Sequence, residues 1–194
     1  AYADAMREVW KANPDNSDVA TLFAESLMDL HPWNYWDKGK AQPWTGEIVE
    51  TLETALRLDP QNPGANHFYI HILEASATPE RALVSARRLR NLVPDSSHIV
   101  HMPAHVYIRT GDYAAAAKTN EVAAAVDRAY IEKSGAQGIY PMMYYSHNLH
   151  FIAMCSAMVG DYPEARKAAD MLAAHVVPAV KEMPPLEGFM TLPI

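Results

Sequence analysis

The sequence of 194 residues offers little for covalent cross-linking, membrane insertion or nucleic-acid binding. Its single cysteine, Cys155, excludes a disulfide framework and any multi-cysteine metal or iron–sulfur site. No apolar run reaches the roughly 18 residues that a membrane-spanning helix needs, so we expect no membrane insertion. Acidic residues outnumber basic ones by 23 to 16, and the net charge of −7 argues against nucleic acid as the main partner.

Motifs of the common enzyme classes are also missing. The chain has no Gly-rich phosphate loop, no Gly-x-Ser-x-Gly segment and no His-Glu-x-x-His segment. Hydrophobic residues make up 49% and charged residues 20%, which excludes a disordered chain and predicts a packed core. The sequence therefore names no reaction and no catalytic residue, and whether the protein is an enzyme stays open.

The two ends of the sequence resemble the interior of a protein. The first dozen residues have the apolar spacing of a helix in progress, and the last six are mostly apolar. We therefore expect a piece of a longer chain. No targeting segment can be read from such a piece. A bacterial, periplasmic or secreted protein is compatible with the sequence, which assigns neither a compartment nor an oligomeric state.

A period of 34 residues organises the chain. His67 and His101 are 34 residues apart, and the segment Gly-Asp-Tyr at 111–113 recurs 49 residues later at 160–162. Apolar residues at helical spacing, interrupted by Pro and Gly, predict antiparallel helix pairs and no strand. We expect single helices over 97–109 and 142–159, and an all-α solenoid with units at about 1–16 (partial), 17–60, 61–94, 95–140 and 141–178, followed by an irregular segment at 179–194.

The sequence resembles the tetratricopeptide repeat (TPR) family over nearly its whole length. The matching motifs are Ala104…Tyr107…Gly111-Asp112-Tyr113…Ala116, Gly160-Asp161-Tyr162-Pro163-Glu164-Ala165, and the helix endings at 56–60 and 89–94. The resemblance implies a single right-handed superhelix of about four repeats, whose first helices line a concave groove. Segments 67–71 and 101–107 further resemble a histidine-bearing group of bacterial TPR proteins of unsettled function. The resemblance thus implies a fold but no reaction.

Seven of the nine histidines fall on the predicted first helices of three successive units. Their i, i+3 and i, i+4 spacings place the side chains on one helix face. Neutral imidazole is a common ligand of zinc, copper and iron. We therefore predict a transition-metal site, with its densest part where the second and third units meet. The candidate ligands are His67, His71, Glu74, His101, His105, His147 and His150.

The same groove is expected to bind a small molecule, a peptide or a partner protein. The candidate contact residues are Glu25, His98, Tyr107, Arg109 and Asn148. A non-catalytic scaffold without metal is the alternative interpretation, in which the histidines contact a partner or make the groove sensitive to pH. Because groove side chains add little to a core, we expect His101→Ala to leave the melting temperature almost unchanged.

The remaining candidates have structural interpretations. Trp33, Tyr35, Trp36 and Trp44 form an aromatic cluster in the insertion at 32–43, which predicts a packed lid or a pocket wall. His31, in the same loop region, and His175, on a second helix, are expected to be structural or exposed to solvent. Cys155 lies in an apolar stretch and is expected to be buried and inert.

Overall fold

The computed structural model describes residues 1–188 and confirms an all-α fold. The chain divides into two compact units, an N-terminal unit of residues 1–92 and a C-terminal unit that begins at Val93. Helix ends coincide with the predicted Pro and Gly interruptions to within a few residues. Among the described residues, no helix combines the length and the apolar character needed to cross a membrane.

The N-terminal unit is a run of short helices, two of which begin at asparagine caps. Its elements are α1 (Tyr2–Ala12), α2 (Ser17–Met28), α3 (Thr45–Leu58), α4 (Pro63–Leu73), a 3-10 turn (Pro79–Ala82) and α5 (Leu83–Leu92). The side-chain oxygen of Asn16 accepts from Val19 N at 3.1 Å, and that of Asn62 accepts from Ala65 N at 2.9 Å. Each cap satisfies a backbone N–H that has no partner within its helix.

Small residues set the packing of this unit. Ala20 of α2, Ala55 of α3 and Ala65 of α4 are fully buried together, with Trp10 and Leu56 packed against them. Alanine at these positions lets three helices approach closely, while the larger neighbours fill the remaining space. This arrangement fits the helix pairs that the sequence predicts.

A short hairpin in the insertion at 32–43 corrects the expectation of no strand. Strands β1 (Trp36–Asp37) and β2 (Lys40–Ala41) pair antiparallel, and the loop Gly39 has a φ of +79°. The Trp36 indole N–H donates to the carbonyl of Ile72, which ties the hairpin to the end of α4. Two residues per strand are too few for an alternating pattern to appear in the sequence.

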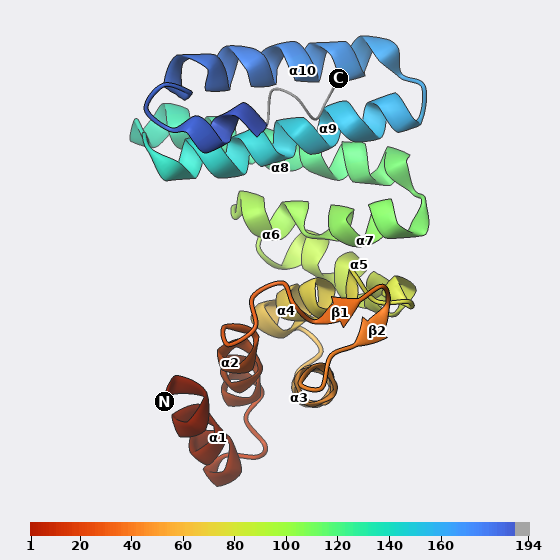
Figure 1. Ribbon diagram of the computed structural model, residues 1–194, viewed down its shortest axis with the longest axis vertical. Coiled ribbons are helices and arrows are strands. Elements are labelled where there is room, and N and C mark those ends of the chain that lie inside the picture. The colour runs from red at the N-terminus through yellow and green to blue at the C-terminus, as the bar shows by residue number, and fades with distance from the viewer. Residues whose placement is uncertain (189–194) are drawn as a thin grey trace. The chain divides into compact units, whose positions relative to one another are not determined.

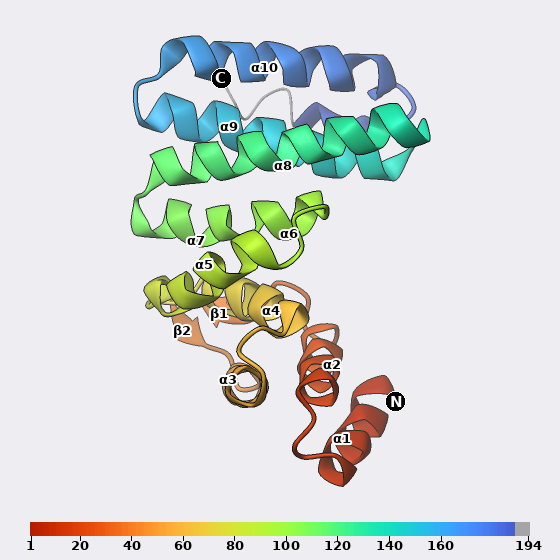
Figure 2. The ribbon, with the colours of Figure 1, turned by 180° about the vertical axis from the view of Figure 1, so that it is seen from behind.

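The C-terminal unit stacks its helices in chain order, as Figure 1 and Figure 2 show. Its elements are α6 (Ser97–His101), α7 (Pro103–Thr110), α8 (Tyr113–Ser134), a π-helical turn (Pro141–Tyr145), α9 (Ser146–Met158), α10 (Tyr162–Val176) and 3-10 turns at Val177–Ala179 and Pro184–Glu187. Leu186 of the last turn is buried against Leu172 and Val176 of α10. The predicted irregular segment therefore contains a docked turn, and its final residues, 189–194, lie outside the described residues.

Two predicted single helices are interrupted. Pro103 has no backbone N–H, so the helix expected over 97–109 divides at Met102 into α6 and α7. Met102 keeps right-handed helical angles, and the two pieces continue in nearly the same direction (Figure 1). The helix expected from Met142 likewise begins as the π-helical turn at Pro141.

The repeated Gly-Asp-Tyr segments form the turns between paired helices. Gly111 ends α7 in the left-handed conformation, with a φ of +84° that favours glycine. The next residue, Asp112, caps α8 by accepting from Ala115 N at 3.1 Å. Asp161 caps α10 in the same way, so the 49-residue repeat in sequence is a repeat of one turn geometry.

Candidate functional site

Three imidazole rings converge inside the C-terminal unit. His101 ends α6, His105 follows one turn later on α7, and His147 comes from α9. One ring nitrogen from each lies within 4.8 Å of the others, and Nε2 of His101 is 2.8 Å from Nε2 of His105. Three of the six predicted histidine ligands are thus brought together within one unit.

The buried Asn120 side chain of α8 fixes the orientation of the His101 ring. The Asn120 amide group donates to the carbonyl of Ala116 at 2.9 Å, which leaves its Oδ1 facing His101. His101 Nδ1 lies 2.8 Å from that oxygen and therefore carries the ring proton as the donor. The lone pair of His101 is then on Nε2, which points at His105 and accepts from its Nε2–H.

Burial keeps His101 uncharged. The residue is 1% exposed, and this desolvation, with the nearby His105 and His147, lowers its pKa well below the ordinary histidine value. A neutral imidazole with a fixed Nδ1 proton has the form in which histidine binds metals through Nε2.

Phe151 forms the apolar wall of the three-histidine cluster. Its ring centroid lies 4.8 Å from that of His147, one turn earlier on α9. The corresponding distances to His101 and His105 are 5.0 and 5.3 Å. The Phe151 ring therefore gives the three-histidine cluster one apolar side, while His105 and His147 stay only partly buried.

Two further histidines flank this cluster. His98 stacks on His101 with ring centroids 6.0 Å apart, and the Tyr144 ring contacts His98 edge-on with centroids 5.3 Å apart. His150 follows His147 by one turn of α9, is partly buried, and has its pKa lowered by that burial. Among the described residues, His150 is in none of the groups of three close ligand atoms.

The N-terminal unit holds the other predicted donors. The rings of His67 and His71 lie 4.9 Å apart on α4, and His71 Nδ1 is 3.0 Å from a carboxylate oxygen of Glu74. The exposed ring of Trp33, in the insertion, contacts His71 edge-on at 5.1 Å. Since these residues and the three-histidine cluster belong to different units, a joint site stays a prediction.

Asn148, one of the residues predicted to contact a ligand in the groove, is buried in a hydrogen-bond network. Its amide donates to Ser97 Oγ at 3.0 Å and to Asp127 Oδ2 at 2.7 Å. The other oxygen of Asp127 accepts from Tyr140 OH at 2.9 Å, and Asp127 is 0% exposed. This network joins α6, α8 and α9 around one buried carboxyl group.

Replacing Asp127 with alanine should lower the free energy of unfolding by about 2–4 kcal/mol, because it leaves the Asn148 and Tyr140 donors without their acceptor. Urea unfolding of the full chain measures this change. Tyr140→Phe is the matched control, since it removes one hydrogen bond and should cost about 1 kcal/mol. Equal and small losses in both variants would contradict the central role of Asp127.

Three other residues predicted to line the groove, Glu25, Arg109 and Tyr107, differ in their exposure and contacts. Glu25 accepts a hydrogen bond from Tyr2 OH at 3.2 Å, and Arg109 is exposed near the end of α7. Tyr107 packs against a buried cluster that includes Ala104 and Phe151. None of these contacts tests the predicted ligand groove, which stays a proposal.

The predicted structural residues are found in structural settings. His31 stacks on Trp44 with ring centroids 3.7 Å apart, and His175 Nε2 lies 3.0 Å from the carbonyl of Pro141. Cys155 is buried, and this burial raises the pKa of its thiol to about 11, which keeps it protonated at neutral pH.

Stability should depend on pH through His101. Its pKa is lower in the folded chain than in the unfolded chain, so the unfolded state takes up protons first as the pH falls below about 6.5. The contribution of neutral His101 to the free energy of unfolding is therefore complete above that pH. Below it, this contribution falls by up to about 1.4 kcal/mol per pH unit. Urea unfolding in chelator between about pH 7 and 5.5 measures the slope, and the variant His101→Leu should reduce it. An unchanged slope in the variant would contradict the assignment.

Sequence reasoning missed Asn120 and Phe151. Both lie outside the histidine pattern: Asn120 is on a second helix, 19 residues from His101, and Phe151 belongs to the apolar stretch that also contains Cys155. A usable signal for Asn120 exists, because it is a polar residue on the buried face of the alanine-rich helix α8.

Comparison with known proteins identifies a fold class but no family. No protein-family model matches the chain, and no curated protein matches it. Two crystal structures of MamA are similar: one at a TM-score of 0.67 and 15% identity, covering 93% of this chain and 84% of MamA, the other at 0.68 and 16%, covering 92% and 89%. The chain therefore has the fold of a TPR-like α-solenoid. The narrower resemblance to the histidine-bearing group stays a prediction.

Proposed function

We propose that this chain is a TPR-like binding scaffold whose C-terminal unit binds one transition-metal ion through His101, His105 and His147. The observation that supports this proposal is the convergence of their three ring nitrogens within 4.8 Å. The Asn120 contact adds support, because metal-bound histidines are commonly oriented by a hydrogen bond from their other ring nitrogen.

The spacing of the nitrogens suits a metal ion after a small adjustment. Tetrahedral zinc with Zn–N bonds of about 2.0–2.1 Å places its ligand nitrogens roughly 3.3 Å apart. The Nε2 atoms of His101 and His105 are 2.8 Å apart in their hydrogen bond, so these two rings have to separate by only a few tenths of an ångström, and the His147 nitrogen lies within 4.8 Å of both. Three imidazoles suit zinc, copper or iron and leave a further coordination position for water or a ligand.

The other predicted donors belong to the same proposal in a supporting role. The His71–Glu74 pair, with His67 beside it, is a second donor set in the N-terminal unit. His150, one turn from His147, is an outer histidine of the C-terminal unit. Glu25, His98, Tyr107 and Arg109 are proposed to contact a small molecule, peptide or protein bound by the scaffold.

A scaffold that binds a partner protein without metal is the second candidate. The fold favours it, because stacked helix pairs present extended surfaces that bind other proteins. In that case the His101–His105 hydrogen bond and the Asn120 contact serve packing alone. The two candidates differ in one property, which is the uptake of metal by the purified chain.

Metal titration of the full chain, purified without an affinity tag, separates the candidates. We expect uptake of one equivalent of zinc in competition with a chromogenic chelator, and the same stoichiometry for His31→Ala, whose ring stacks on Trp44 outside the cluster. The metal proposal fails if neither zinc, copper nor iron(II) binds. The scaffold candidate would then stand alone.

A further inference from the structure

Three cavities of similar size occupy equivalent places in the helix pairs. Within the N-terminal unit, one of about 300 Å³ lies between α1 and α3, and one of about 320 Å³ lies between α3 and α5. Within the C-terminal unit, one of about 270 Å³ lies between α8 and α10. Each cavity is also lined by the helix that lies between those two helices in the sequence, which is α2, α4 and α9 respectively.

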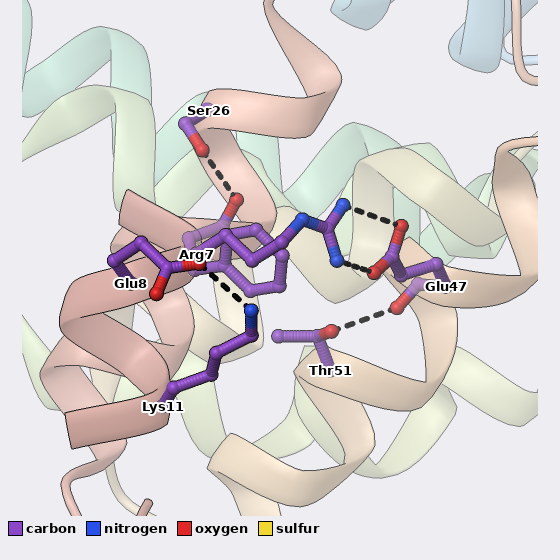
Figure 3. Close-up of polar contacts among 7 residues, drawn as sticks. Arg7, Glu8, Lys11, Ser26, Glu47 and Thr51 are labelled. Atoms are coloured by element: carbon purple, nitrogen blue, oxygen red, sulfur yellow. Dashed lines mark hydrogen bonds and ion pairs between the residues drawn. The ribbon is translucent and has the colours of Figure 1, made fainter. Parts of the chain in front are cut away.

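Charges balance in the cavity between α1 and α3. Arg7 and Lys11 line it together with Glu47 and Glu50. Figure 3 shows the Arg7 guanidinium group bound by both carboxylate oxygens of Glu47, one of them at 3.0 Å, and the guanidinium carbon lies 4.9 Å from the centre of the Phe23 ring. The positive charge of Arg7 is therefore paired with a carboxylate of the same chain.

Charges also balance in the cavity between α8 and α10. Arg128 and Lys167 line it together with Glu121 and Glu164. Lys167 Nζ lies 3.0 Å from a carboxylate oxygen of Glu164. Neither of these two cavities carries a net charge that would attract an ion.

The cavity between α3 and α5 differs because three arginines face one glutamate. Oε1 of Glu53 accepts from Arg81 Nη2 at 2.6 Å and from Tyr69 OH at 2.7 Å. Burial and this carboxylate raise the pKa of Tyr69 to about 12, so its hydroxyl stays a donor. Glu53 therefore neutralises Arg81 alone, and the lining keeps two positive charges.

The two remaining arginines have no acidic partner among the described residues. Arg57 donates a hydrogen bond to Thr54 Oγ1, an uncharged acceptor, at 2.8 Å. Arg88 makes no hydrogen bond or ion pair with any of the described residues. Leu56 and Val84 line the same cavity, and Val84 is 52% exposed. The site thus combines two available guanidinium groups with exposed apolar surface.

We propose that this cavity binds an acidic segment of a partner protein. Guanidinium groups bind carboxylates through paired hydrogen bonds, so Arg57 and Arg88 would each hold an Asp or Glu side chain. An apolar side chain of the segment would cover Leu56 and Val84, which a small inorganic anion cannot do. This local positive charge is unusual in a chain of net charge −7, and the proposal is independent of the metal site.

Fluorescence anisotropy of the full chain with labelled peptides tests the proposal. The probe is an acetylated peptide of about eight residues in which Asp and Glu surround two leucines. We expect saturable binding that weakens as salt is raised. The double variant Arg57→Gln/Arg88→Gln should weaken it at least tenfold. Arg87→Gln/Arg90→Gln is the matched control, because it removes two exposed charges of α5 that do not line the cavity and should change affinity less than twofold.

The competing outcomes are distinguishable. A peptide with both leucines replaced by serine should bind several-fold more weakly, and inorganic phosphate at millimolar concentration should compete only weakly. Displacement by phosphate together with equal binding of the serine peptide would overturn the proposal in favour of a simple anion site. Equal losses in the two double variants, or no peptide binding at low salt, would also overturn it.

Discussion

Replacing His147 with alanine is expected to weaken zinc binding to the full chain at least 100-fold, which corresponds to about 2.7 kcal/mol. His147 supplies one of three converging nitrogens, and two imidazoles on one helix turn hold zinc far less tightly than three. His147 is only partly buried, so the variant should fold with nearly unchanged helix content. Competition titration against a chelator of known affinity measures the loss.

Two matched variants make this result interpretable. His105→Ala should weaken zinc binding by a similar factor, because it removes another nitrogen of the cluster. His31→Ala should leave the affinity unchanged, because that ring stacks on Trp44. Unchanged affinity in both His105→Ala and His147→Ala would show that zinc, if bound, is bound elsewhere on the chain.

Replacing His101 with alanine is expected to lower the free energy of unfolding of the metal-free chain by about 3 kcal/mol. The substitution leaves the buried Asn120 oxygen without its donor and opens a cavity beside Phe151. This expectation replaces the sequence-based one of an almost unchanged melting temperature, because a side chain that is 1% exposed belongs to the core and not to an open groove. Urea unfolding in chelator measures the effect.

A double substitution separates the lost hydrogen bond from the lost volume. In His101→Leu/Asn120→Leu both polar partners become apolar, so the Asn120 oxygen is no longer left unsatisfied, and the double variant should be more stable than the separate losses of His101→Leu and Asn120→Leu predict in sum. Additive losses would contradict the assigned coupling between the two side chains.

The helix pairs could be predicted from the sequence because their turns carry the information locally. Gly111 needs a left-handed conformation, and Asp112 caps the next helix, so two adjacent residues specify the turn. The hairpin at 36–41 could not be predicted in this way. It depends on contacts distant in sequence, such as the hydrogen bond from Trp36 to Ile72 and the bridge between Gly39 and Ser76.

The candidate site was predicted in part for the same reason. The spacing of His101 and His105 is a helical repeat that the sequence displays directly, and the interruption at Pro103 leaves their rings in contact. The sequence pattern does not show which of these residues are buried. His101 and Asn148 have the spacing of groove residues, but both lie in the interior, where Asn120 and Asp127 of α8 are their hydrogen-bond partners.

Anomalous scattering from crystals of the full chain grown with zinc tests the central claim most directly. The account predicts one strong peak in the C-terminal unit, bounded by the Nε2 atoms of His101 and His105 and a ring nitrogen of His147, at about 2.0–2.1 Å from each. A structure with the His101–His105 hydrogen bond intact and no peak beside these three rings would contradict it.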